Sequence, residues 1–132
     1  MTMARGLVLT LVLGGVAVGA AASAAGTPDL ALGKAAFAAC ASCHQIGPGA
    51  RAGFGPQLNG VMGRRAGSTT DFKYSEAMKK AGFIWDERLL AAFIDSPEKL
   101  VPGTKMRFFG LGYDEKKVAA LAAYLRASST AP

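Results

Sequence analysis

The feature that most constrains this chain is a pair of cysteines followed directly by its only histidine. The chain has 132 residues, and its two cysteines and one histidine all fall in the segment from Cys40 to His44, which reads CASCH. In such a Cys-x-x-Cys-His segment, the two thiols can reach the two vinyl groups on one edge of a porphyrin, and the adjacent imidazole can reach its iron. The segment therefore predicts one covalently bound haem c, with Cys40 and Cys43 as thioether partners and His44 as an iron ligand.

The same cysteines have other possible uses. An even, low number of cysteines in an exported protein often indicates a disulfide. A thioredoxin-like Cys-x-x-Cys motif expects alternating strands and helices around it, whereas this chain has helical patterns, glycine-rich loops and few β-branched runs. A zinc site needs four ligands, and the sequence offers no further cysteine or histidine. Haem attachment remains the favoured interpretation.

The N-terminal 24 residues have the pattern of a secretory signal peptide. Arg5 precedes an apolar run from Leu7 to Ala20, and Ala22 and Ala24 supply the small residues of a cleavage site. An uncleaved membrane anchor is the alternative, because the uncharged stretch is just long enough to span a bilayer. We expect cleavage, which leaves residues 25–132 as a single domain in the periplasm.

Helix-forming segments alternate with loops in the remaining chain. The expected helices run from Asp29 to Ala39, from a cap at Ser75 to Gly82, from a cap at Asp86 to just before Pro97, and from a cap at Asp114 through Leu125. Residues 47–67 are rich in glycine and predict a loop. These helices alone give a thin core, which a buried macrocycle would complete. The prediction is an all-α fold of about four to five helices with long loops wrapped around one haem.

A series of motifs extends from Gly33 to Ser128. In chain order the motifs are Gly33 to Phe37, Cys40 to His44, Gly55 to Gly60, Gly63 to Gly67, Tyr74, Trp85, Pro102 to Met106, and Leu121 to Leu125. With these motifs the chain resembles the class I cytochromes c, the small electron-transfer proteins of mitochondria and photosynthetic bacteria.

The resemblance implies a role for several residues around the haem. The carbonyl of Pro56 would accept a hydrogen bond from Nδ1 of His44, which fixes the tautomer and raises the basicity of the ligand. The haem propionates would accept hydrogen bonds from Arg64, Tyr74, Trp85 and Thr104. Plain core packing is the alternative role for the aromatic residues.

The resemblance also implies how the first and last helices meet. Gly33 would let these helices cross closely, with Phe37 stacked near Leu121 and Tyr124. Mere softening of the first helix is the alternative role for Gly33.

The second iron ligand has three methionine candidates after cleavage. Met106 follows a Pro-Gly turn and matches the ligand position of the family, while Met62 and Met78 are expected to fill space in a loop and a helix. A His44–Met106 pair would leave no open position on iron, which argues against catalysis at the metal. Phe93 and Met78 replace residues that are often polar in the family, so the potential and the strength of the Met106 bond stay open.

Charge bears on the partners. The formal net charge is +6, and removal of the segment with Arg5 leaves 14 basic against 9 acidic residues. A basic surface favours encounter with acidic partner faces. The candidate basic rim around the haem edge consists of Lys34, Arg51, Lys99 and Lys105. Several lysines of the mitochondrial proteins are missing, with Ala39, Gly53, Glu98, Gly112 and Tyr113 in their places.

The sequence contains no nucleic-acid-binding motif, so we expect no nucleic acid among the partners. We expect a monomer that meets larger redox proteins through the haem edge and binds no small-molecule substrate.

Three functions are compatible with this sequence. The first is a non-enzymatic electron carrier between a cytochrome bc complex and a terminal oxidase or photosynthetic reaction centre. The second is a dedicated electron acceptor of one periplasmic dehydrogenase. The third, a haem enzyme or gas sensor with a labile axial methionine, is disfavoured by Met106.

Overall fold

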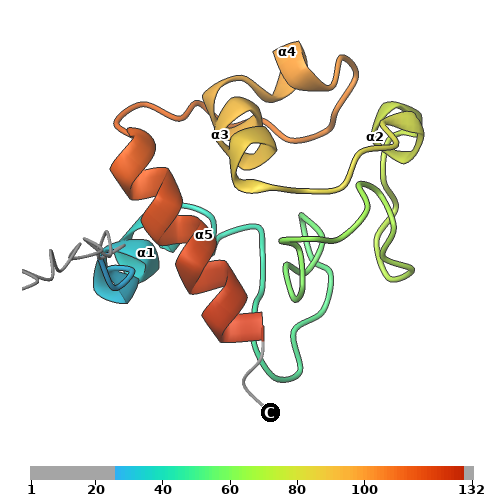
Figure 1. The fold of residues 1–132 in the computed structure, drawn as a ribbon. Helices are drawn as coiled ribbons and strands as arrows, with labels where there is room; N and C mark the ends of the chain where they lie inside the picture. The colour runs from blue at the N-terminus through green and yellow to red at the C-terminus, as the bar shows by residue number, and fades with distance from the viewer. Residues whose placement is uncertain (1–25, 130–132) are drawn as a thin grey trace, which may run out of the picture.

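The computed structural model describes residues 26–129, so the expected signal peptide lies outside the described residues. Within these residues five helices follow one another (Figure 1): α1 Leu30–Phe37, α2 Glu76–Lys80, α3 Glu87–Asp95, α4 Pro97–Leu100 and α5 Glu115–Ser129. Loops join them, except that Ser96 alone separates α3 from α4. Within residues 26–129, regular structure is helical apart from one antiparallel bridge between Arg65 and Ile84. The all-α prediction is confirmed. None of the described helices is long and apolar enough to cross a membrane.

The expected helix starts are confirmed by their capping hydrogen bonds. In each case a side-chain oxygen accepts a bond from the backbone N–H three residues later: Asp29 from Leu32, Ser75 from Met78, Asp86 from Leu89, and Asp114 from Lys117. The distances range from 2.7 Å for the Asp86 cap to 3.1 Å for the Ser75 cap. Helix α1 ends at Phe37, two residues before the expected end, because the chain tightens there into the turns that carry the cysteines.

Helix α4 was not predicted. It begins with Pro97 in its first turn, where the missing N–H has no intrahelical partner to lose. The N–H of Val101 donates to the carbonyl of Pro97 at 2.9 Å and closes its single turn. Helix α4 packs against α3, which is where the short turn gains its stability.

The crossing of α1 and α5 organises the core. A Cβ atom added to Gly33 would collide with the carbonyl of Ala120 and would lie 2.6 Å from Cβ of Tyr124, so only glycine fits here. The rings of Phe37 and Tyr124 lie 5.6 Å apart. The hydroxyl of Tyr113 donates to the carbonyl of Ala36 at 2.6 Å and ties the start of α5 to α1. The close crossing and the Phe37–Tyr124 contact expected from the sequence are both confirmed.

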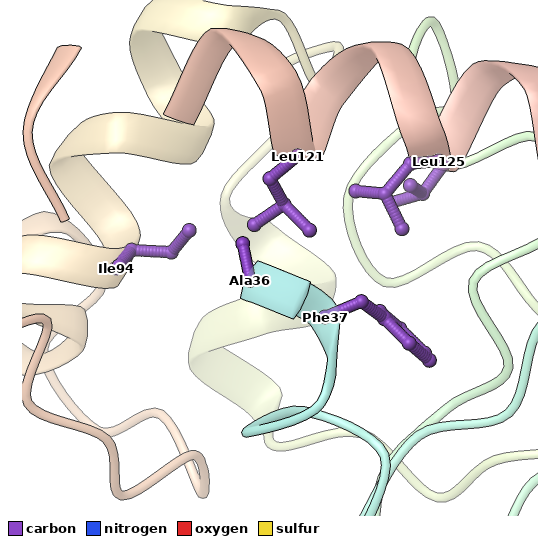
Figure 2. Close-up of a cluster of buried hydrophobic side chains, with 6 residues drawn as sticks. Ala36, Phe37, Ile94, Leu121 and Leu125 are labelled. Carbon is purple, nitrogen blue, oxygen red and sulfur yellow. The ribbon is translucent and has the colours of Figure 1, made fainter. Parts of the chain in front are cut away.

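Buried apolar side chains gather beside this crossing. Figure 2 shows Ala36 and Phe37 of α1, Leu121 and Leu125 of α5, and Ile94 of α3 converging on one region. A second buried cluster lies around the central loops and α2 and α3, and consists of Ala66, Tyr74, Met78, Phe93 and Val101. The two clusters share Trp85 at their border.

Leu121 should be among the residues on which stability depends most. Its side chain is 1% exposed, so Leu121→Ala should lower the free energy of unfolding by about 2–5 kcal/mol through lost burial and an unfilled space. Denaturant unfolding of the haem-loaded protein measures this change. Leu111→Ala is the matched control, because Leu111 is 90% exposed, and should stay within about 0.5 kcal/mol of the parent protein. Equal losses in the two variants would contradict this account of the core.

Candidate functional site

A cavity of about 380 Å³ lies between the two buried clusters. Every site residue expected from the sequence lines it: Cys40, Cys43, His44, Pro56, Arg64, Tyr74, Trp85, Thr104 and Met106. Much of the remaining wall is apolar and was not assigned from the sequence: Leu58, Val61, Phe72, Leu90, Ile94, Phe108 and Leu125. The structure therefore brings residues from most of the chain onto one predominantly hydrophobic surface.

The two cysteines and the histidine reach the cavity from one tight turn after α1. The N–H groups of Cys43 and His44 both donate to the carbonyl of Cys40, at 3.1 and 2.9 Å. Both cysteines are free thiols, Cys40 half-buried and Cys43 exposed. Burial, and then the nearby Cys43, raises the pKa of Cys40. Two thiols and one imidazole are thus presented side by side to the same space.

The orientation of His44 is fixed by a hydrogen bond. Its Nδ1 lies 2.8 Å from the carbonyl oxygen of Pro56. A carbonyl can only accept, so Nδ1 carries the proton and Nε2 keeps its lone pair. Burial lowers the pKa of His44, although the bond to Pro56 opposes that effect, and the ring is therefore neutral at neutral pH. A neutral imidazole with an available Nε2 is the form that binds a metal.

Gly55 allows the backbone to pass directly beside this ring. A Cβ atom at Gly55 would lie 2.5 Å from Cε1 and 2.8 Å from Nδ1 of His44. The N–H of Gly55 donates to the carbonyl of Cys43 at 2.9 Å, which holds the loop against the turn. The sequence motif contained Gly55, but its contact with His44 could not be foreseen from it.

Backbone pairing brings Arg64 and Trp85 together on the cavity wall. The N–H of Trp85 donates to the carbonyl of Arg64 at 2.9 Å, next to the bridge between Arg65 and Ile84. The guanidinium of Arg64 donates to the carbonyls of Asn59 and Gln57, at 2.6 and 3.0 Å. Burial lowers the pKa of Arg64, but a guanidinium remains charged in proteins. A half-buried cation on an apolar wall suits a ligand with carboxylates.

The aromatic residues of the wall serve packing as well. The hydroxyl of Tyr74 shares a hydrogen bond of 2.8 Å with that of Thr69. The indole of Trp85 packs edge-on against the rings of Phe83 and Phe93, with centroids 4.8 and 5.1 Å away. Core packing and contact with a bound ligand are both compatible with these positions.

The three methionines differ in their relation to the cavity. Met62 does not line it and packs instead against the first buried cluster, as a space-filling residue would. Met106 lines it, and its N–H donates to Oγ1 of the buried Thr104 at 3.3 Å. Met78 also lines the cavity, close to Phe93 in the second cluster, although the sequence assigned it only a packing role. Two thioethers rather than one therefore reach this surface.

The set of donors fits haem c. Two neighbouring thiols, a neutral imidazole, a thioether, apolar walls and a half-buried cation match a large apolar macrocycle with iron and carboxylates. Across residues 26–129, no group of three or more His, Cys, Asp or Glu side chains could hold a metal ion by itself. The geometry therefore favours a porphyrin over a zinc site.

Comparison with known proteins agrees with this geometry. The sequence model of the cytochrome c family matches residues 30–129. Cytochrome c2 of Rhodoblastus acidophilus is 53% identical over 87 residues, which cover 66% of this chain and 79% of that protein. Cytochrome c2 of Blastochloris viridis is 42% identical over 116 residues, covering 88% and 91%. The solved structure of cytochrome cH from Methylobacterium extorquens has 44% identity and a TM-score of 0.66, covering 74% of this chain and 96% of that one.

A side chain at position 55 should disturb His44. Gly55→Ala should lower the free energy of unfolding of the haem-loaded protein by about 1–3 kcal/mol, because the new methyl group overlaps the imidazole. Denaturant unfolding followed in the haem absorption band measures the loss. Gly53→Ala is the matched control, since its Cβ would meet only the carbonyl of Cys43, at 3.9 Å. The close approach at His44 would be refuted by equal stability of the two variants.

Proposed function

Because this chain belongs to the cytochrome c family, we propose that it carries single electrons, on one covalently bound haem c, between larger redox proteins. The observation that carries the proposal is that Cys40, Cys43, His44 and Met106 all line the same cavity. This combination of two thiols and two potential axial ligands on an apolar surface has a clear use in haem attachment.

Different residues would attach the haem covalently, bind its iron and orient the iron ligands. Cys40 and Cys43 would form the thioether bonds to the haem, and Nε2 of His44 and the sulfur of Met106 would bind its iron. When bound, the haem supplies reversible one-electron exchange at its iron. Pro56 keeps His44 in the ligating tautomer through the 2.8 Å hydrogen bond. An iron held by both His44 and Met106 would leave no position for a substrate, which supports a carrier over an enzyme.

The cavity wall tunes the potential and excludes water. A thioether is a soft ligand that favours the ferrous state, so Met106 raises the reduction potential. Apolar side chains such as Phe93 and Leu90 keep the surroundings at low dielectric, which further disfavours the added charge of the ferric state. Arg64 offers its positive charge to the propionates.

We infer that partners dock where the cavity opens to the surface. Lys34, Arg51, Lys99 and Lys105 are all exposed, and Lys105 borders the cavity. Phe109 and Leu111 are 81% and 90% exposed in the loop that follows Met106. Of these four basic residues only Lys105 lines the cavity. A cation at the cavity edge, together with exposed basic and apolar side chains elsewhere on the surface, suits a partner with an acidic rim and an apolar centre.

The donor and acceptor follow from the class of carrier. We infer a cytochrome bc complex as donor and a terminal oxidase or photosynthetic reaction centre as acceptor, as for the class I cytochromes c that the sequence resembles. Removal of residues 1–24 on export would place the working carrier in the periplasm as a monomer. The apolar run before Ala22 and Ala24 supports that location.

Met106 should prove to be the axial thioether. Met106→Ala should abolish the sulfur-to-iron charge-transfer band of the oxidised protein, lower the potential strongly, and let the reduced protein bind carbon monoxide. Met62→Leu and Met78→Leu are the controls, and both should keep the band with only a modest change in potential. Since Met78 also lines the cavity, loss of the band in Met78→Leu and its survival in Met106→Ala would reassign the ligand.

Docking should depend on ionic strength. The Debye length falls from about 10 Å at 0.1 M salt to about 3 Å at 1 M, so the rate constant for reduction by an isolated cytochrome bc complex should fall as salt is added. Lys105→Gln should lower the rate at low salt more than Lys116→Gln, because only Lys105 borders the cavity. Stopped-flow kinetics measures the rate constant of each protein as a function of salt concentration. A rate independent of salt would instead assign docking to apolar contacts alone.

A further inference from the structure

The loop that carries Met106 is tied to one acidic side chain on both sides. Oε1 of Glu98 accepts a hydrogen bond from the N–H of Gly103 at 3.0 Å, and Oε2 pairs with Nη1 of Arg107 at 3.3 Å. The same Nη1 donates to the carbonyl of Thr104 at 3.1 Å. Glu98 thus bridges Gly103, three residues before Met106, and Arg107, directly after it. We refer to these bonds among Glu98, Gly103, Thr104 and Arg107 as the Glu98 clamp.

Glu98 is held by a helix that packs against the rest of the fold. Glu98 lies in the first turn of α4, whose Pro97 is buried and whose turn is closed by the bond from Val101 to Pro97. The N–H of Thr104 donates to the carbonyl of Val101 at 3.0 Å, so the loop begins directly from this helix. Because α4 packs on α3, the carboxylate is held in a fixed place relative to the cavity wall.

Besides the Glu98 clamp, one long-range hydrogen bond ties this loop to the rest of the chain: Nζ of Lys105 donates to the carbonyl of Lys73 at 2.8 Å. Lys105 and Arg107 are exposed on either side of Met106, which is only half-buried. Thr104 is the one buried side chain between positions 103 and 107. A segment with so few buried contacts opens locally at low cost, and each hydrogen bond that closes it has a proportionate effect.

We propose that Glu98 is a positioning residue for Met106, and that the Glu98 clamp sets how readily this loop leaves the iron. The inference rests on the proposed function, in which Met106 is the axial ligand. The Glu98–Arg107 ion pair alone contributes little, since its side chains are 60% and 73% exposed. The stronger element is the bond from the Gly103 amide to a charged carboxylate. Opening the loop breaks both together.

The test uses imidazole as a probe that competes with Met106 for the iron of the oxidised, haem-loaded protein. Glu98→Ala removes the two bonds that Glu98 makes, to Gly103 and to Arg107, and should increase the apparent affinity for imidazole about three- to tenfold, the range expected for one or two lost hydrogen bonds. Glu98→Gln keeps an acceptor for the Gly103 amide and should produce a smaller increase. Amide exchange at Gly103, followed by NMR, should be faster in Glu98→Ala, a readout that is independent of ligand binding.

Glu87→Ala is the matched control. Glu87 also forms an exposed ion pair, with Arg126 at 3.8 Å, but this pair joins α3 to α5 and does not involve the Met106 loop. The control removes the same charge and should leave the imidazole affinity unchanged. An unchanged affinity in Glu98→Ala, or an equal increase in Glu87→Ala, would overturn the inference.

The outcome can be separated from a failure of the proposed function. If the parent protein lacks the sulfur-to-iron band, Met106 is not its ligand and both proposals fall. If the parent has the band and Glu98→Ala behaves like the parent, only the role of Glu98 is lost.

Discussion

The close crossing of α1 and α5 is the contact on which the rest of this structure depends. Only a glycine at position 33 lets the two backbones approach, and that approach buries Phe37 against Leu121 and Tyr124. Leu121 and Leu125 then form part of the cavity wall, and the end of α1 leads directly into the turn from Cys40 to His44. The same contact therefore positions the covalent attachment site and one wall of the haem pocket. Because those walls belong to a thin helical core, haem binding and folding are linked.

The parts of the fold that could be predicted are those governed by local interactions. Ser75, Asp86 and Asp114 could be identified as caps because each bonds an N–H only three residues away, whereas Asp29 was expected only as the first residue of its helix and caps it in the same way. Helix α4 was missed although Pro97 is a favourable residue for a first turn. Four residues are too few to show a helical period, and the turn is stabilised by packing against α3, which a periodicity argument does not register.

In the candidate site, too, some residues could be recognised from the sequence and others only from the tertiary structure. Its polar and sulfur-bearing residues were recognisable because they belong to motifs with fixed order, and all of them line one cavity. The apolar wall was not recognisable, since Phe72, Leu90 and Phe108 meet only through the tertiary fold. The same reason explains why Gly55 against His44, and Met78 on the cavity surface, emerged only from the structure. Long-range approach leaves no periodic trace in a sequence.

The two departures from the family pattern acquire a physical meaning in this setting. Phe93 and Met78 are 6% and 7% exposed, and Met106 packs against the cluster that they form. A thioether is a weak hydrogen-bond acceptor, so apolar packing costs it little on the inner side of the loop. Polar bonds to the loop come instead from its outer side, through Glu98. Under the proposed ligation by Met106, substitutions inside the cavity would act mainly on the potential, through the dielectric around iron, while changes at Glu98 would act on how long Met106 stays bound.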